Sequence, residues 1–594
     1  MTMTLLKSLC RIPTLSFLTG PIFDKELRVS SRRRRNYVLR FVYLALLTIF
    51  LALVWFEEVS YRGAAVYTVS RMARAGQSII LTIVWFQFCA TQLAAIIMLS
   101  TSISDEIYHR TLGVLMTTPI NAFQIVMGKL FSKLLQLILL LAIGMPLLAI
   151  VRVFGGVPWN YVLSSVCITL ATIIFVGSVT LFFSIFSRRA YVVIIVTILV
   201  LGVIFALAPI LVFVSLHDVI SEKQFFSFFS AFNPYFLLAM NTDLMVTPRW
   251  MGPMAILSWP GHCGIMLAAS AIILAFAVIL VRRAALRQAA GEPGGQAAGD
   301  LAEGKTTGRD GFTVVVTMPR RVKGPPVLWK ELRYALFKRH RIAACVIILA
   351  ALAVLLITYG LCAKERALDE SGTHILYGLI FMGLGILFTT IIPASSITSE
   401  KESRAWPLLL ATTLNDWQIV LGKFIGALRR CGPIWLFLFG HIVIFTLSGI
   451  IRPVCIVQIA IVVAGVVVFL TGSGLYFSAR LRNTTAAVIA NFAIAATIWA
   501  IAPLLIALIF NITHYDYEPL EVSLDANPFV QTGVVMNATA RVAGIYYRPN
   551  YEFATGALNA EDATVFLLSC MVVYVFLGFI FIFRAKSRLR RNVF

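Results

Sequence analysis

The amino-acid sequence predicts an all-α integral membrane protein of about twelve transmembrane helices, arranged as two tandem repeats of six. The first observation is composition: 59% of the 594 residues are hydrophobic and 13% are charged, whereas soluble domains contain about 45–50% apolar residues. The second is the recurrence of nearly uncharged runs of about 20 residues, the length of a helix that crosses a bilayer. The third is an internal repeat. Since helices satisfy their own backbone hydrogen bonds in lipid, these runs indicate an all-α fold.

Twelve apolar runs define the predicted transmembrane helices. We expect the first to remain as an anchor, because residues 1–20 lack the charged, apolar and cleavage regions of a signal peptide. The predicted spans are 37–57, 78–101, 130–151, 161–186, 190–215, 262–281, 342–362, 374–397, 431–451, 454–479, 484–511 and 563–583.

The net charge of +23 is distributed unevenly along the chain. With the N-terminus in the cytoplasm, most Lys and Arg residues fall on the cytoplasmic side of the predicted helices, while the acidic residues are divided between the two sides. This is the positive-inside pattern, and a basic inner face attracts anionic lipid headgroups. We therefore expect a multi-pass protein of the cell (inner) membrane with both termini in the cytoplasm, whose basic surface faces membrane lipids and binds no nucleic acid.

Two segments of the sequence match without a gap at an offset of 294 residues. Residues 103–130 match residues 397–424, and the same offset relates Asn233-Pro234 to Asn527-Pro528. Because each copy has six helices, an even number, both copies enter the membrane in the same orientation and are predicted to be parallel repeats. The predicted domains are a cytoplasmic N-terminal tail (1–19), a first six-helix unit (20–283), a flexible cytoplasmic linker (284–323) and a second six-helix unit (324–594).

The sequence offers no candidate for a catalytic or metal site. The nine cysteines include no CxxC pair and the seven histidines are dispersed, so no set of ligands or catalytic groups is apparent. His441, inside a predicted span, is interpreted as a hydrogen-bonded packing residue. Gly299, Gly304, Lys305 and Thr306 satisfy the phosphate-binding pattern GxxxxGK[ST], but the Gly-rich linker cannot supply the flanking strand and helix that such a loop needs. We predict that the chain is not an enzyme and holds no cofactor.

A short polar segment lies between the second and third predicted spans of each half. Each segment has a Glu with an Arg four positions later, a Leu-rich turn, a Thr-Thr pair and a Gly-Lys pair that enters the next span: DEIYHRTLGVLMTTPINAFQIVMGK and SEKESRAWPLLLATTLNDWQIVLGK. Residues four apart share one face of a helix, so Glu106 with Arg110 and Glu400 with Arg404 are predicted to form ion pairs. An amphipathic Lys-Glu-Leu-Arg segment also precedes the first span of each half, at 25–28 and 330–333.

Together with the Asn-Pro pairs, these segments resemble the ABC-2 type transporter permease family over almost the whole chain, in duplicate. The resemblance implies that 104–121 and 398–415 are coupling helices, which seat in clefts of ATPase subunits, and that the Lys-Glu-Leu-Arg segments are interfacial elbow helices. It implies two separately encoded ABC ATPase subunits as partners, with ATP bound in the partner. The residues to which it assigns coupling are Glu106, Arg110, Thr118, Pro119, Glu400, Arg404 and Thr412.

Plainer interpretations exist for the same segments. Interfacial anchoring alone accounts for the elbow segments, and the polar segments also read as ordinary cytoplasmic loops. The two copies differ, since Pro119 becomes Thr413 and Trp406-Pro407 replaces Leu112-Gly113. The two ATPase contacts are therefore not expected to be equivalent.

The resemblance favours the membrane-spanning permease subunit of an ABC transporter that exports an unidentified substrate. The outer loops, 216–261 and 512–562, are too short for a large capture domain, which favours a hydrophobic or lipid-linked substrate. A twelve-helix secondary transporter is one alternative, although such carriers bury ionisable relay residues and no Asp or Glu lies near the middle of a predicted span. A membrane anchor of an ATP-driven machine that transports nothing is the other alternative.

Overall fold

The computed structural model of the chain divides it into two compact units, Met1–Thr313 and Val314–Phe594. It describes residues 21–29, 34–59, 68–108, 111, 112, 114, 118, 120–151, 157–187, 190–209, 212, 222–246, 258–289, 324–333, 341–364, 366–513, 518–540 and 550–590.

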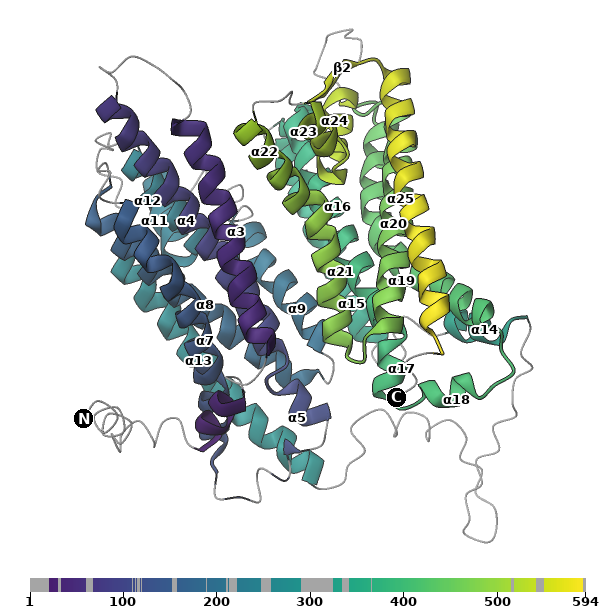
Figure 1. Cartoon of the computed structure of the whole chain (residues 1–594), viewed down its shortest axis with the longest axis horizontal. Helices are drawn as coiled ribbons and strands as arrows, with labels where there is room; N and C mark the ends of the chain where they lie inside the picture. The colour runs from purple at the N-terminus through teal and green to yellow at the C-terminus, as the bar shows by residue number, and fades with distance from the viewer. Residues whose placement is uncertain are drawn as a thin grey trace. The chain divides into compact units, whose positions relative to one another are not determined.

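Helices account for all the regular structure described in the first unit (Figure 1). A short helix covers 21–29. It is followed by α3 (Arg34–Val59), α4 (Thr68–Ser100), α5 (Ser104–Tyr108), α7 (Ala122–Val151), α8 (Trp159–Phe186), α9 (Ala190–Gly202), the π-helical turn η3 (Val203–Leu207), α11 (Glu222–Phe232), α12 (Pro234–Val246) and α13 (Trp259–Ala289).

The second unit repeats this order and adds a small β-hairpin that the sequence did not predict. Its strands β1 (Tyr551–Phe553) and β2 (Gly556–Leu558) pair antiparallel, with Glu552 opposite Ala557. The helices are α14 (Pro326–Arg333), α15 (Arg341–Lys364), η4 (Ala367–Asp369), α16 (Ser371–Ser396), α17 (Thr398–Glu402), α18 (Trp406–Leu410), α19 (Asp416–Leu447), α20 (Val454–Arg480), α21 (Thr484–Ala496), the π-helical turn η5 (Thr497–Ile501), α22 (Ala502–Thr513), α23 (Glu518–Asp525), α24 (Pro528–Thr539) and α25 (Ala560–Arg588).

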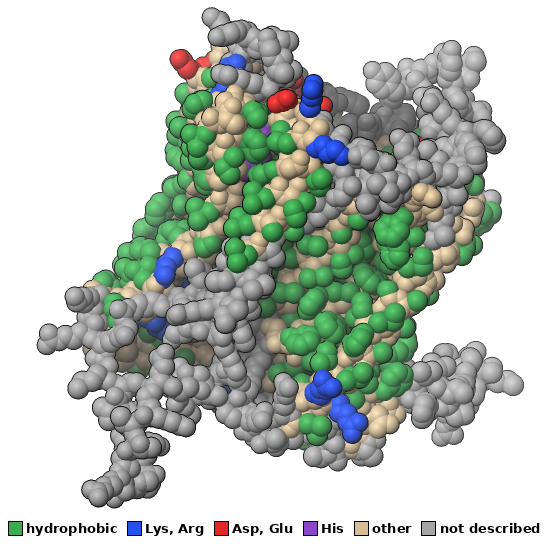
Figure 2. Space-filling view, turned by 180° about the vertical axis from the view of Figure 1, so that it is seen from behind, with side chains coloured by type: hydrophobic (Ala, Val, Ile, Leu, Met, Phe, Trp, Pro, Cys, Tyr) green, Lys and Arg blue, Asp and Glu red, His purple; other side chains and the backbone are tan. Residues whose placement is uncertain are grey.

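Ten helices within the described residues are long and apolar enough to cross a membrane. Two shorter apolar helices, Ala190–Ala206 and Ala351–Lys364, fall within the predicted spans 190–215 and 342–362. The all-α membrane fold is therefore confirmed, and the expected count of about twelve corresponds to the ten long helices and these two. Hydrophobic side chains cover much of the described surface in Figure 2, as expected for helices that face lipid.

The predicted linker is described only at its start, where α13 continues to Ala289. The remainder of the linker, including the GxxxxGK[ST] residues, lies outside the described part of the chain. The end of each half that carries α5 or α17 is called its basal end; it is the end that the charge distribution predicts to face the cytoplasm.

Each unit has a hydrophobic core built around its fourth long helix. In the first unit α8 packs against α4 and α13, and in the second α20 packs against α16 and α25. Gly472 of α20 lies against the backbone of Gly578 of α25, so closely that a side chain at either position would collide with the facing helix. Close approach through small residues is a common way for helices to associate in a membrane.

The π-helical turns occur at matching positions of the two halves. A π-helical turn displaces one backbone carbonyl from the regular hydrogen-bond pattern, and an asparagine side chain binds a carbonyl in each case. Asn233 Nδ2 donates to Phe205 O at 2.6 Å, and Asn527 Nδ2 donates to Trp499 O at 3.0 Å. The other end of each amide, Oδ1, accepts a backbone N–H of the helix that follows, from Tyr235 at 3.0 Å or Phe529 at 3.0 Å. The repeated Asn-Pro pair thus joins a short helix to a transmembrane helix.

Hydrogen bonds between elements hold the His441 side chain inside the second unit, in agreement with the sequence interpretation. Tyr359 Oη lies 2.5 Å from His441 Nδ1, His374 Nδ1 lies 3.3 Å from His441 Nε2, and His374 Nε2 lies 2.9 Å from Leu368 O. Because a carbonyl only accepts, His374 carries its hydrogen on Nε2, His441 donates from Nε2, and Tyr359 donates to His441 Nδ1. These hydrogen bonds are complete with both imidazoles neutral, as expected for a hydrogen-bonded histidine inside the core.

Candidate coupling site

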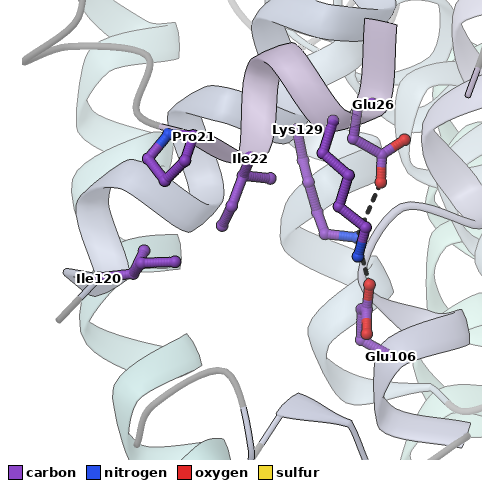
Figure 3. A pocket seen from close by; sticks show the side chains of 7 residues that line it. Pro21, Ile22, Glu26, Glu106, Ile120 and Lys129 are labelled. Atoms are coloured by element: carbon purple, nitrogen blue, oxygen red, sulfur yellow. Dashed lines mark hydrogen bonds and ion pairs between the residues drawn. The ribbon is translucent and has the colours of Figure 1, made fainter. Parts of the chain in front are cut away.

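Three elements of the first half meet at its basal end around the ammonium group of Lys129. Lys129 Nζ lies 3.0 Å from Glu106 Oε1 of α5 and 3.8 Å from Glu26 Oε1 of the 21–29 helix, and it donates to Ser102 O at 2.6 Å. Figure 3 shows Glu26 and Glu106 on opposite sides of this lysine, beside a pocket of about 130 Å³. Lys133 reaches the second oxygen of Glu26 at 3.7 Å.

The same arrangement recurs in the second half with shorter distances. Lys423 Nζ of α19 lies 2.6 Å from Glu331 Oε1 of α14 and 2.7 Å from Glu400 Oε1 of α17. Lys330 also pairs with Glu400 at 3.0 Å, and Arg430 pairs with Glu331 at 3.0 Å. We call each lysine with its two glutamates the basal ion cluster of that half.

The clusters use equivalent residues of the repeat. Lys129 and Lys423, like Glu106 and Glu400, are separated by the 294-residue offset, and Glu26 and Glu331 occupy the same place in the two Lys-Glu-Leu-Arg segments. Charges taken out of water are costly unless they are paired and hydrogen-bonded. The duplicated clusters therefore hold the elbow segment, the polar segment and the third long helix of each half in one arrangement.

Gly422, the residue before Lys423, allows α14 and α19 to pack closely in the second half. A Cβ atom on Gly422 would lie 2.8 Å from Val327 Cγ1 and 3.1 Å from Leu328 N of α14. Any larger residue would push α14 away and lengthen the ion pairs of Lys423. The Gly-Lys pair of the repeated motif is thus explained by close packing followed by charge pairing.

The predicted pairing of Glu400 with Arg404 is wrong. Helix α17 ends at Glu402, and Arg404 is exposed and has a left-handed backbone with φ of 58°. The two residues therefore do not share a helical face, and Glu400 pairs with Lys423 and Lys330. In the first half Glu106 pairs with Lys129 and accepts a hydrogen bond from Thr111 Oγ1, and Arg110 lies outside the described residues.

The remaining predicted residues lie on the surface of the polar segments or are not described. Thr118 is exposed. Thr412 is also exposed, and its Oγ1 donates to Leu409 O at 2.6 Å. Pro119 lies outside the described residues. Among the described residues, the ion pairs of the basal ion clusters do not include Thr412.

Each polar segment combines a buried anchor with an exposed apolar residue two positions later. Leu112 and Trp406 occupy matching positions, and each is only 1% exposed. Val114 and Leu408 also match, and their exposed fractions are 66% and 74%. An exposed apolar side chain therefore occupies the same position in both polar segments.

The second polar segment is fixed further to the turn between α20 and α21. Lys401 Nζ donates to Ser478 O at 3.0 Å, to Leu481 O at 3.1 Å and to Ala479 O, all at the end of α20. A lysine at the C-terminal end of a helix is favourable because the last carbonyls carry partial negative charge. Helix α17 and the end of α20 are therefore joined by a charged group.

Glu402 completes this attachment by accepting the backbone N–H of Thr484, the first residue of α21, at 2.6 Å. The first half has Ile107 and Tyr108 at the positions of Lys401 and Glu402. An isoleucine can form neither an ion pair nor a side-chain hydrogen bond. The two polar segments are thus attached differently to their halves.

Sequence reasoning missed Lys129, Lys423, Glu26 and Glu331 as members of the site. Interfacial anchoring alone does not explain the Lys-Glu-Leu-Arg segments, because Glu331 is only 5% exposed and binds two cations. The sequence did contain a signal for these residues, because both halves repeat a glutamate in the Lys-Glu-Leu-Arg segment and a lysine in the Gly-Lys pair. A search of the described residues finds no group of His, Cys, Asp and Glu that could hold a metal ion.

One protein-family model matches a segment of the chain that covers most of the first half. A family model described as ABC-2 family transporter protein matches residues 21–286, which span the 21–29 helix through the first basal ion cluster to α13. No curated protein matches the sequence. Residues 21–286 are thus similar to ABC-2 family transporter proteins, and the described part of the chain contains ten helices that are long and apolar enough to cross a membrane.

Proposed function

We propose that this chain supplies both membrane halves of an ABC exporter and that two separately encoded ATPase subunits bind its two polar segments. The observation that carries the proposal is the duplicated basal end, where a buried ion cluster supports a segment with an exposed apolar residue. The family match covers the first half, and the equivalent residues of the second half extend the proposal to the whole chain.

The geometry supports transmission of movement from the polar segment to the membrane helices. A partner that grips Leu408 displaces α18 and α17. Glu400 is bound to Lys423, so the displacement reaches the start of α19 and, through Glu331, helix α14. Lys401 and Glu402 pass the same displacement to α20 and α21. ATP is bound and hydrolysed in the partner, and this chain holds no nucleotide.

The direction and the substrate class follow from the family resemblance and from the loops. Export of a hydrophobic or lipid-linked molecule suits a protein whose outer segments are short and whose surface is largely apolar. The position of the ion clusters argues against the secondary transporter, because Lys129, Lys423 and Glu331 lie at the basal end and bind structural partners. The non-transporting anchor would use the same ATPase contact and differs only in the absence of substrate movement.

The test is purification of the intact chain from its native membranes in mild detergent, with mass spectrometry of the proteins that remain bound. We expect an ABC ATPase at about two copies per chain. Placing aspartate at both Val114 and Leu408 should reduce the recovered ATPase strongly, since loss of an anchor residue costs about 2 kcal/mol per site, roughly 30-fold in affinity.

The matched control is Asn559→Asp, which adds a carboxylate at an exposed position before the first residue of α25, at the end of that helix opposite the polar segment. It should leave ATPase recovery unchanged. If the wild-type chain repeatedly retains no ATPase while it remains folded, the proposal fails and the secondary transporter becomes the better hypothesis. If the ATPase is retained equally by the double variant, the polar segments are not the contact.

A further inference from the structure

A groove of about 160 Å³ lies between α19 and α25 at the basal end of the second half. All its lining side chains are apolar and come from both helices, among them Trp417, Leu421, Phe424, Phe579 and Phe583. The floor is closed by Val420 and Ile582, which are buried. The groove is therefore a preformed apolar channel and does not require the helices to separate.

Three of the side chains that line the groove are exposed on the surface of the second unit. Leu421, Phe579 and Phe583 are 55%, 50% and 58% exposed. A tryptophan lies at the basal end of the groove, where Trp417 and Phe583 meet edge to face with ring centres 5.1 Å apart. Since tryptophan is enriched where a membrane helix meets the headgroup region, this end of the groove is expected at the level of the lipid headgroups.

Cationic side chains gather at the same end of the groove. Lys586 Nζ lies 4.7 Å from the centre of the Trp417 ring, and Arg584 and Arg588 belong to the same last turns of α25. Arg590 pairs with Asp416 at 2.8 Å. No carboxylate within the described part of the chain pairs with Lys586, so its ammonium group remains available for an anion beside the mouth of the groove.

We propose that this groove binds one anionic phospholipid of the cytoplasmic leaflet, with an acyl chain along the apolar floor and the phosphate beside Lys586. Charge complementarity supports this occupant: an apolar channel that ends in basic side chains at the headgroup level matches a lipid whose headgroup is negative. A neutral lipid would fill the channel without engaging the net positive charge. The site is separate from the polar segments and does not depend on an ATPase partner.

The first half provides an internal comparison. Phe123 occupies the position of Trp417, and Met127 occupies that of Leu421. The fluorescence of a tryptophan placed at Phe123 would detect lipid beside α7, the equivalent helix, where the Trp417–Lys586 pair is not present. Helix α13 also carries basic residues near its end, Arg282 and Arg283, so the comparison tests the contribution of the Trp417–Lys586 pair itself.

The test uses quenching of tryptophan fluorescence by lipids with brominated acyl chains. The full-length chain is reconstituted in phosphatidylcholine vesicles that contain increasing fractions of brominated phosphatidylglycerol or brominated phosphatidylcholine. The protein has ten tryptophans, so the Trp417 signal is taken as the difference between the wild type and Trp417→Phe. We expect half-quenching at a several-fold lower fraction of the anionic lipid.

Charge variants separate a headgroup site from simple contact with lipid. A lysine near a membrane surface contributes about 1 kcal/mol to attraction of anionic lipid, so Lys586→Gln should reduce the preference roughly five-fold, whereas Lys586→Arg should retain it. Lys364→Gln, at the opposite end of the second half, should have no effect. In the Trp417→Phe background, Phe123→Trp should show a smaller difference between the two lipids than Trp417 does.

Two outcomes would overturn the proposal. Equal quenching of Trp417 by the two lipids would show that the groove has no headgroup preference. Absence of quenching by either lipid would show that protein covers the groove, from the other half of this chain or from a second copy. The wild-type comparison stands without the charge variants, so poor folding of a variant does not leave the proposal untested.

Discussion

Replacing Lys423 with methionine is expected to destabilise the basal end of the second half by about 3–5 kcal/mol, the usual cost of removing one partner from a buried ion pair. The lysine side chain is 3% exposed, and it lies between Glu331 and Glu400, which are 5% and 14% exposed. Without the ammonium group, Glu331 keeps Arg430 and Glu400 keeps Lys330, but the two carboxylates lose the cation that lies between them. Hydrogen exchange measured by mass spectrometry should show that the amides of α14 and α17 exchange more than one hundred times faster.

The repeat supplies the control. Lys129→Met removes the equivalent lysine, but Glu106 and Glu26 are 22% and 24% exposed, and the Glu26 distance is 3.8 Å. Water therefore compensates part of the loss, and we expect a cost of about 1 kcal/mol. Combining Lys423→Met with Glu331→Gln and Glu400→Gln should recover part of the stability, since it removes the repulsion between the two carboxylates. Equal effects of the two lysine variants would contradict the assignment of the second cluster as the more buried.

Asn527→Leu is expected to lower the free energy of local opening of η5 and of the start of α24 by about 2–4 kcal/mol. The substitution preserves the size of the side chain but removes two hydrogen bonds. Loss of the helix cap to Phe529 N costs about 1 kcal/mol, and the carbonyl of Trp499, left without its donor, costs about 1–3 kcal/mol more. Hydrogen exchange should increase in 497–501 and in 528–532, with little change in α14.

Asn527→Asp separates the two contributions. A carboxylate still accepts from Phe529 N, so the cap remains, but it cannot donate to Trp499 O and places a negative charge beside that carbonyl. Exchange should therefore increase mainly in 497–501. In the first half, Asn233→Leu should likewise increase hydrogen exchange around Phe205, because it removes the donor to Phe205 O. If Asn527→Asp behaves like the wild type, the bond to Trp499 O does not stabilise the π-helical turn.

Much of the fold could be predicted because lipid restricts the choice of structure. Apolar runs of the right length become helices, and the offset of the repeat located equivalent elements in both halves. The β-hairpin could not be predicted, because its turn depends on a distant residue. Asp525 accepts hydrogen bonds from the backbone N–H groups of Ala554 and Thr555 at 2.8 and 2.9 Å.

The polar segments could be located from the sequence, but the partners of their glutamates could not. Spacing of four residues suggested a pair only if one helix continued from Glu400 to Arg404, and the left-handed residue at 404 shows that it does not. The partners of Glu400 lie on α14 and α19, which are far away in sequence and become neighbours through packing. His374 and His441 show the same limit, since 67 residues separate two side chains that share one hydrogen bond.

The attachment of only the second polar segment by Lys401 and Glu402 has a consequence for how such a protein can evolve. In a homodimer of half-length chains, each mutation appears in both subunits. A substitution that stabilises one side of the complex can therefore destabilise the other side. A tandem duplication within one chain removes that restriction and lets each copy diverge. Lys401 binds three carbonyls in the second copy, whereas the first copy has Ile107, whose side chain has no hydrogen-bond donor, at the matching position. The two copies have therefore diverged at this attachment and no longer need to be symmetric.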